Sequence, residues 1–103
     1  MIMGVAGIII WTSDLKRLLP FYQNSLGLKP NSVHSDFVSF KWGDKVRLGI
    51  GVHSKVSGQS KEPHRVMVNL EVDNIHEVHH HLSSNGVEFI RVPQKEHWGG
   101  WIC

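Results

Sequence analysis

The chain contains an internal repeat with a period of sixty residues. At this shift the segment GIIIWTSDL, residues 7–15, aligns with the segment MVNLEVDNI, residues 67–75. Each segment begins as an apolar strand, passes through a short polar step and enters a helix. A supersecondary unit of this kind cannot bury its apolar face alone, so repeated copies pack on each other. The sequence therefore predicts two equivalent modules, each of which opens with a strand followed by a helix.

Both predicted helices carry an apolar stripe and matching end signals. Gly27 and Gly86 follow the two stripes, where glycine takes the left-handed conformation that ends a helix. Ser13 and Asp73, or their neighbours, are the candidate N-caps. Pro20 removes a backbone hydrogen bond inside the first helix, so we expect a kink there rather than a break. Helical spacing of three or four residues relates Leu15, Leu18, Leu19, Tyr22 and Leu26 in the first helix, and Ile75, Val78, His79 and Leu82 in the second.

The remaining segments are predicted as strands from their alternation and their β-branched and aromatic content. The turn residues Gly43 and Asp44 join two of them into a hairpin, Asp36–Trp42 and Lys45–Val52. Residues 54–64 are polar and contain Gly58 and Pro63, so they are interpreted as a loop between the modules. Further strands are predicted around Leu28–Val33, at Arg65–Val72, at Val87–Val92 and from Trp98 onward.

Composition limits the classes of protein to consider. The chain has 103 residues, 41% hydrophobic and 19% charged, which fits a single globular domain. The net charge is +2 and the basic residues are scattered, so no nucleic-acid partner is expected. The longest apolar stretch, Val5–Trp11, is too short to span a membrane. With Cys103 as its one cysteine the chain has no internal disulfide, which is consistent with a cytoplasmic protein.

Three segments resemble a known family. The segment SDLKRLLPFYQNSLGL, and then EPHRVMVNLEVDNIHEV and NGVEFIRVP, are similar to the module sequences of the vicinal-oxygen-chelate superfamily, which comprises glyoxalases, extradiol dioxygenases and bleomycin-resistance proteins. The resemblance implies an α+β fold, in which paired βαβββ-type modules form a curved, half-barrel mixed sheet with helices on its outer face. It implies one domain over residues 1–103, with module one at about 3–53, the loop at 54–64, and module two, incomplete at its C-terminus, at 65–103.

The resemblance also implies where a metal would bind. Metal-binding members carry a ligand in the first strand of each module, and these positions fall on Gly7 and Met67. Glycine has no side-chain donor, and a thioether suits soft copper rather than the divalent ions used in this chemistry. The position of a carboxylate ligand falls near Arg47, whose charge repels a metal. We therefore predict no metal and no cofactor. His76 and His80 have chelating spacing on one helix face, but no third ligand is implied, so they are interpreted as solvated.

Strand alternation places one set of side chains on the sheet face away from the helices. This set is the predicted ligand site, with glycines between its members that leave room for a ligand. Trp11 offers a stacking surface, and Glu71 would select a cation or a hydrogen-bond donor. The alternative is a solvent-exposed sheet face without a ligand, on which Arg47 and Glu71 only form a surface ion pair with each other. The predicted site consists of Trp11, Arg47, His53, Asn69 and Glu71.

The leading hypothesis for function is a small-molecule-binding protein without the usual metal site, whose ligand is aromatic or drug-like. One alternative is a lyase, isomerase or dioxygenase that uses a metal at non-standard positions or an acid–base pair of His53 and Glu71. A second alternative is a degenerate member that serves as an interaction module. A homodimer is also predicted, because Trp98, Trp101 and Ile102 are large apolar residues near the end of an incomplete second module.

Overall fold

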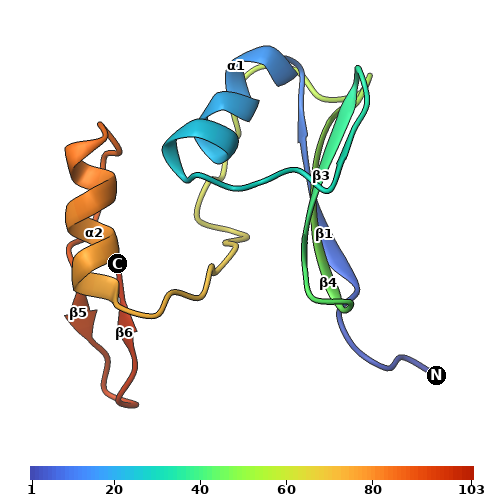
Figure 1. Ribbon diagram of the computed structural model, residues 1–103. Coiled ribbons are helices and arrows are strands. Elements are labelled where there is room, and N and C mark those ends of the chain that lie inside the picture. Colours follow the sequence, from blue (N-terminus) through green and yellow to red (C-terminus); the bar gives the residue numbers. More distant parts are fainter. The chain divides into compact units, whose positions relative to one another are not determined.

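The protein is described by a computed structural model that covers every residue from Met1 to Cys103 (Figure 1). It forms two compact units, Met1–Ser60 and Lys61–Cys103. The boundary lies in the predicted polar loop between the modules. None of the helices has the length and apolar content that crossing a membrane requires.

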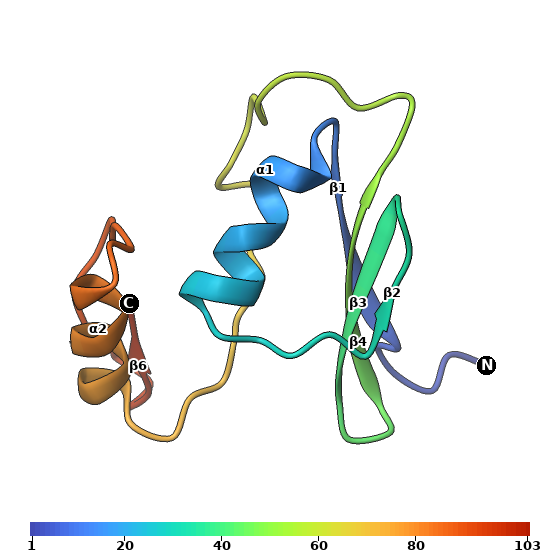
Figure 2. The ribbon, with the colours of Figure 1, turned by 45° about the horizontal axis from the view of Figure 1, so that its top comes forward.

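Unit 1 contains a curved four-stranded mixed sheet in the order β1-β4-β3-β2 (Figure 2). The central strand β4 pairs in parallel with β1 and antiparallel with β3, and β2 pairs antiparallel with β3. The predicted hairpin and the first strand are confirmed. The strands are β1 (Gly7–Thr12), β2 (Ser32–Val33), β3 (Phe37–Trp42) and β4 (Val46–Val52).

The helix of unit 1 changes type at its proline. Helix α1 (Leu15–Pro20) begins after Asp14, whose side chain accepts a hydrogen bond from the Arg17 N–H at 3.3 Å. Pro20 has no N–H to donate, and the chain continues as a turn of π-helix, η1 (Phe21–Ser25). The expected kink is therefore a switch from α to π geometry within one helical segment.

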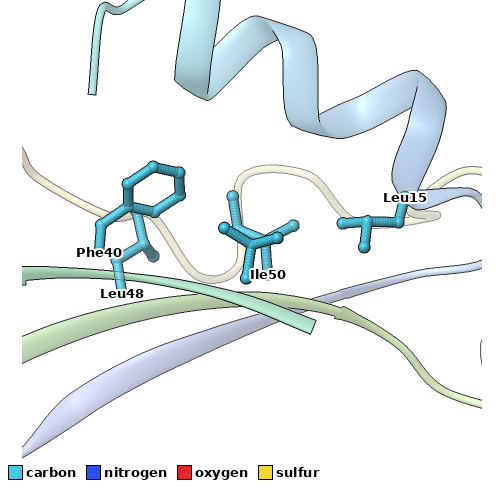
Figure 3. Packing of buried hydrophobic residues seen from close by; sticks show 5 residues of the cluster. Leu15, Phe40, Leu48 and Ile50 are labelled. Carbon is cyan, nitrogen blue, oxygen red and sulfur yellow. The ribbon is translucent and has the colours of Figure 1, made fainter. Parts of the chain in front are cut away.

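Helix and sheet meet in a small core, shown in Figure 3. Phe40 and Ile50 are almost fully buried, because the alternation of β3 and β4 turns them toward α1. The stripe predicted for the first helix supplies most of the covering layer. The buried cluster consists of Leu15, Val38, Phe40, Leu48 and Ile50, with Ile10, Leu18, Leu19, Tyr22 and Leu28 packed against it.

Tyr22, the one tyrosine of the chain, reports on this packing. Burial raises the pKa of its phenol above the ordinary value of 10.0. The folded state therefore keeps this proton at a pH where the unfolded chain loses it, so the associated stability is complete below pH 10 and falls as the pH rises through the folded pKa. We expect an absorbance titration of tyrosinate to give a higher midpoint for the folded protein than for the protein in denaturant. Equal midpoints would contradict this packing.

Unit 2 contains one helix and a two-stranded sheet. Helix α2 (Ile75–Ser84) begins after Asn74, whose side chain accepts from the Glu77 N–H at 3.1 Å. It ends at Ser84, and the predicted end signal Gly86 follows the C-cap Asn85 with a φ of 88°. The Val87 N–H donates to the Leu82 carbonyl at 3.0 Å, which closes the helix as a Schellman motif. Strands β5 (Gln94–Lys95) and β6 (Trp101–Ile102) pair antiparallel.

Two predicted strands of unit 2 are wrong. Residues Arg65–Val72 and Val87–Val92 belong to no strand, although the first alternates as a strand does. A segment with alternating apolar and polar residues forms a β-strand only beside a second strand, because its backbone N–H and C=O groups must pair with those of a neighbour. In unit 1 that neighbour of β1 is β4, whereas no strand of either sheet pairs with residues 65–72. The short β5–β6 pair corresponds to the pairing of β2 with β3.

Candidate ligand-binding site

The face of the unit 1 sheet that points away from the core is called here the open face. On β4 its members, Arg47, Gly49 and Gly51, alternate with the buried Leu48 and Ile50. Strand register extends each of these positions into a row that crosses the sheet. The rows are Trp11–Gly51–Phe37, then Ile9–Gly49–Ser39 with Ser32 beside it, and finally Gly7–Arg47–Lys41.

Two aromatic rings lean over the central strand in the first row. The ring centroids of Trp11 and Phe37 are 5.9 Å apart and tilted by 57°. A Cβ added to Gly51 would lie 2.5 Å from the Phe37 ring and 3.0 Å from the Trp11 ring. Any side chain at position 51 would clash with these rings, so the glycine at this position allows the two rings to meet. Trp11 nevertheless keeps 40% of its surface exposed.

The Phe37 ring also reaches the second row. A Cβ added to Gly49 would lie 2.4 Å from the Phe37 Cζ atom. The sequence led us to expect that the glycines of β4 leave room for a ligand, and this interpretation is wrong. The space above both glycines is filled by Phe37, because register places that side chain directly across from Gly51. A ligand would meet a surface of rings rather than a bare strand.

His53 extends the aromatic surface at the end of β4. Its ring lies edge-on to Trp11, with centroids 5.1 Å apart. The Nδ1 atom accepts a hydrogen bond from the Lys55 N–H at 3.1 Å. An accepting Nδ1 leaves the ring hydrogen on Nε2, so His53 presents an N–H donor on its free edge. The aromatic surface is defined as Trp11, Phe37 and His53.

The polar members of the open face lie beside and below these rings. Ser39 is buried at 8% exposure, and its hydroxyl is 2.7 Å from that of Ser32. Arg47 and Lys41 are partners in strand register, so two cations stand across from each other in the third row. Lys41 forms an ion pair with Asp44 at 3.6 Å, whereas the Arg47 guanidinium has no hydrogen bond or ion pair within unit 1.

The structure unites only part of the predicted site. Trp11 and His53 are in contact, and Arg47 shares their sheet face. Asn69 and Glu71 are exposed residues of unit 2 and lie outside any strand, so their predicted place on a second sheet face is wrong. Their convergence with Trp11 stays a prediction.

Sequence reasoning missed the members of the open face that lie on β2 and β3, which are Ser32, Phe37, Ser39 and Lys41. The signal was present in the alternation of the segment 36–42, where residues 38 and 40 are turned to the core.

The family resemblance implies a metal-ligand position at Gly7, on β1. A Cβ at Gly7 would lie 2.6 Å from the carbonyl oxygen of Arg47, so the backbone leaves no room for a ligand side chain there. Nowhere in residues 1–103 do three or more histidine, cysteine, aspartate or glutamate side chains gather as a metal site would require. His76 instead contacts Trp101, with ring centroids 5.0 Å apart, and His79 contacts Phe89 at 4.5 Å.

Comparison with known proteins identifies the family. Residues 4–103 match the model of the Glyoxalase/Bleomycin resistance protein/Dioxygenase superfamily. A crystal structure of a glyoxalase/bleomycin resistance protein/dioxygenase from Nocardioides has a TM-score of 0.71 and 25% identity, over 95% of this chain and 72% of that chain. The comparison with curated proteins gave no match.

Two further solved structures share the fold at lower identity. The bleomycin resistance determinant encoded on the transposon Tn5 has a TM-score of 0.67 and 18% identity, over 96% of this chain and 84% of that one. Lactoylglutathione lyase from Agrobacterium tumefaciens has a TM-score of 0.66 and 15% identity, over 95% and 80%. With its mixed βαβββ sheet in unit 1 and the family match over 4–103, the chain belongs to the glyoxalase/bleomycin resistance protein/dioxygenase superfamily.

Proposed function

We propose that this protein binds a planar aromatic small molecule on the open face of unit 1, without a metal. The observation that carries the proposal is the aromatic surface of Trp11, Phe37 and His53, whose rings form one contiguous group on the exposed side of the sheet. The opposite side of the same sheet is closed by α1 and its core. Large aromatic side chains gathered on an exposed surface are typical of interaction sites.

Each ring has a defined part in such binding. Trp11 has the largest ring of the three and is 40% exposed as a residue, so we assign it the main stacking surface. Phe37 supports Trp11 from across the strand and fixes its tilt. His53 adds a hydrogen-bond donor at Nε2 for a polar edge of the ligand. Aromatic pairs contribute about 0.5–1.5 kcal/mol beyond the area that they bury, so two or three such contacts give selective binding.

A matched pair of tryptophan variants tests this function. Trp11 and Trp42 have similar exposure, 40% and 45%, but alternation places Trp42 on the opposite face of the sheet from Trp11. We expect calorimetry with the neutral probe 2-naphthylmethanol to show binding to the wild type and to Trp42→Ala. Trp11→Ala should lose about tenfold or more in affinity while circular dichroism shows an unchanged fold. Equal loss in both variants would place the site elsewhere, and absence of binding to the wild type would refute the proposal.

The metal-free part of the proposal has its own test. Gly7, Met67 and Arg47 stand at the implied ligand positions, and none of them donates to a hard or borderline divalent ion. Protein purified without a nickel column and dialysed against chelator is expected to contain far less than one iron, zinc, nickel or manganese per chain by elemental analysis. About one bound ion per chain would overturn this and favour the alternative of a metal-dependent lyase, isomerase or dioxygenase. Acid–base catalysis by His53 and Glu71, and an interaction module, stay alternative predictions.

We further propose that residues 1–103 form a single domain, that the protein is cytoplasmic, and that it forms a homodimer. Unit 2 supports the dimer because it exposes large apolar side chains, among them Ile90 at 90%, Trp98 at 63% and Trp101 at 47%. The single exposed cysteine, Cys103, is consistent with a reducing compartment. Sedimentation at tens of micromolar is expected to give twice the chain mass, and a monomer at that concentration would refute the dimer.

A further inference from the structure

We infer that the ligand of the open face is an aromatic anion, whose ring lies on Trp11 and Phe37 and whose acidic group is bound by Arg47. This inference rests on the proposed function and names the chemical class of the ligand. It follows from the charge of the third row, from the space beside it and from its spacing to the rings.

The third row carries positive charge without a sufficient counter-charge. Arg47 and Lys41 are directly opposite each other on antiparallel strands, and like charges in that arrangement destabilise a sheet. Asp44 forms an ion pair with Lys41 at 3.6 Å, but the Asp44 side chain is fully exposed. Exposed ion pairs contribute little to stability. Arg47 has no partner in unit 1, and none of the residues in the three rows is acidic. An anion bound here removes the repulsion.

The approach to Arg47 is open on one side. Gly7 is its register partner on β1, and the close backbone contact at Gly7 excludes a side chain from that position. Arg47 itself is exposed. An incoming group therefore meets the guanidinium between Lys41 on one neighbouring strand and bare backbone on the other. A guanidinium binds a planar carboxylate through two parallel hydrogen bonds, which makes this geometry selective for such an anion.

The spacing along β4 sets the size of the ligand. The Phe37 ring extends over Gly49, two residues from Arg47 on the same strand face. Two residues of a strand span about 7 Å, which matches one substituted ring with its acidic group at the edge. Trp11 lies opposite Gly51, four residues or about 13 Å along β4 from Arg47. A fused two-ring system whose near ring lies on Phe37 and whose far ring points toward Trp11 therefore brings a directly attached carboxylate to Arg47 without a long spacer.

The test compares two probes that share one ring system, 2-naphthoate and the neutral 2-naphthylmethanol. Titration calorimetry on the full chain is expected to show that the wild type binds 2-naphthoate about tenfold or more tightly, because hydrogen bonds to charged groups are the stronger ones. Arg47→Gln should bring the two affinities within about twofold of each other, mainly through weaker binding of 2-naphthoate. Arg47→Lys should keep part of the preference. The matched control is Arg17→Gln on α1, which should retain the full preference.

Each outcome separates the inference from the proposed function. Equal binding of the two probes by the wild type, with Trp11 required for both, would overturn the aromatic anion and leave the aromatic site standing. A preference for 2-naphthoate that survives Arg47→Gln, or that is lost equally in Arg17→Gln, would also overturn the inference. If neither probe binds, the inference and the proposed function fail together.

Discussion

Replacement of Phe40 by alanine is expected to lower the free energy of unfolding by about 3–5 kcal/mol. Phe40 is 1% exposed and is one of the largest side chains in the core of unit 1. Its removal leaves a cavity between α1 and the sheet that a cluster of so few residues cannot close. Small domains have only about 5–15 kcal/mol of stability in total, so much of the variant should be unfolded in mild denaturant.

The control for this prediction is Phe21→Ala, which removes the same side chain from a site that is 40% exposed. Its main aromatic contact is the edge-on pair with Tyr22, at 5.2 Å between centroids. Urea unfolding followed by circular dichroism should give a loss of less than about 1.5 kcal/mol for this variant. Similar losses for Phe40→Ala and Phe21→Ala would show that the core does not lie between α1 and the sheet.

A larger side chain at Gly49 is expected to destabilise unit 1 by about 1–3 kcal/mol and to disturb the aromatic surface. Valine otherwise favours strands, so the effect of Gly49→Val comes from the clash with the Phe37 ring at 2.4 Å. A double-mutant cycle isolates that clash. In the background of Phe37→Ala, we expect Gly49→Val to be close to neutral or stabilising. A loss that is the same in both backgrounds would mean that Phe37 does not cover Gly49.

Much of unit 1 could be predicted because its signals are local. The hairpin of β3 and β4 follows from its turn residues. The helical segment of α1 and η1 follows from an apolar stripe, and Gly27, with a φ of 70°, comes after its end. The caps lie one residue after the first candidates, at Asp14 and Asn74, sixty residues apart like the repeat itself. The sequence predicts the strands of unit 2 less well, because a strand at 65–72 forms only beside a second strand that is distant in the sequence. Alternation alone does not supply that neighbour.

In the candidate site too, features local to one strand could be predicted, and features that depend on pairing between strands could not. Alternation correctly placed Trp11 and Arg47 on one face, since residue period is a property of each strand alone. The part played by Phe37 depends on register between β3 and β4, and so does the filling of the space above Gly49 and Gly51. Glycines in a strand mark a close approach of some group, but the sequence does not say whether a ligand or a neighbouring side chain makes it.

The proposal that the open face of unit 1 binds an aromatic ligand is tested most directly by NMR spectra recorded with and without 2-naphthoate. We expect the largest shift changes at the Trp11 indole, the Phe37 ring and the amides of Gly49 and Gly51, with small changes on α1 and throughout unit 2. Changes centred on the exposed tryptophans of unit 2, Trp98 and Trp101, or no changes at saturating probe, would contradict it.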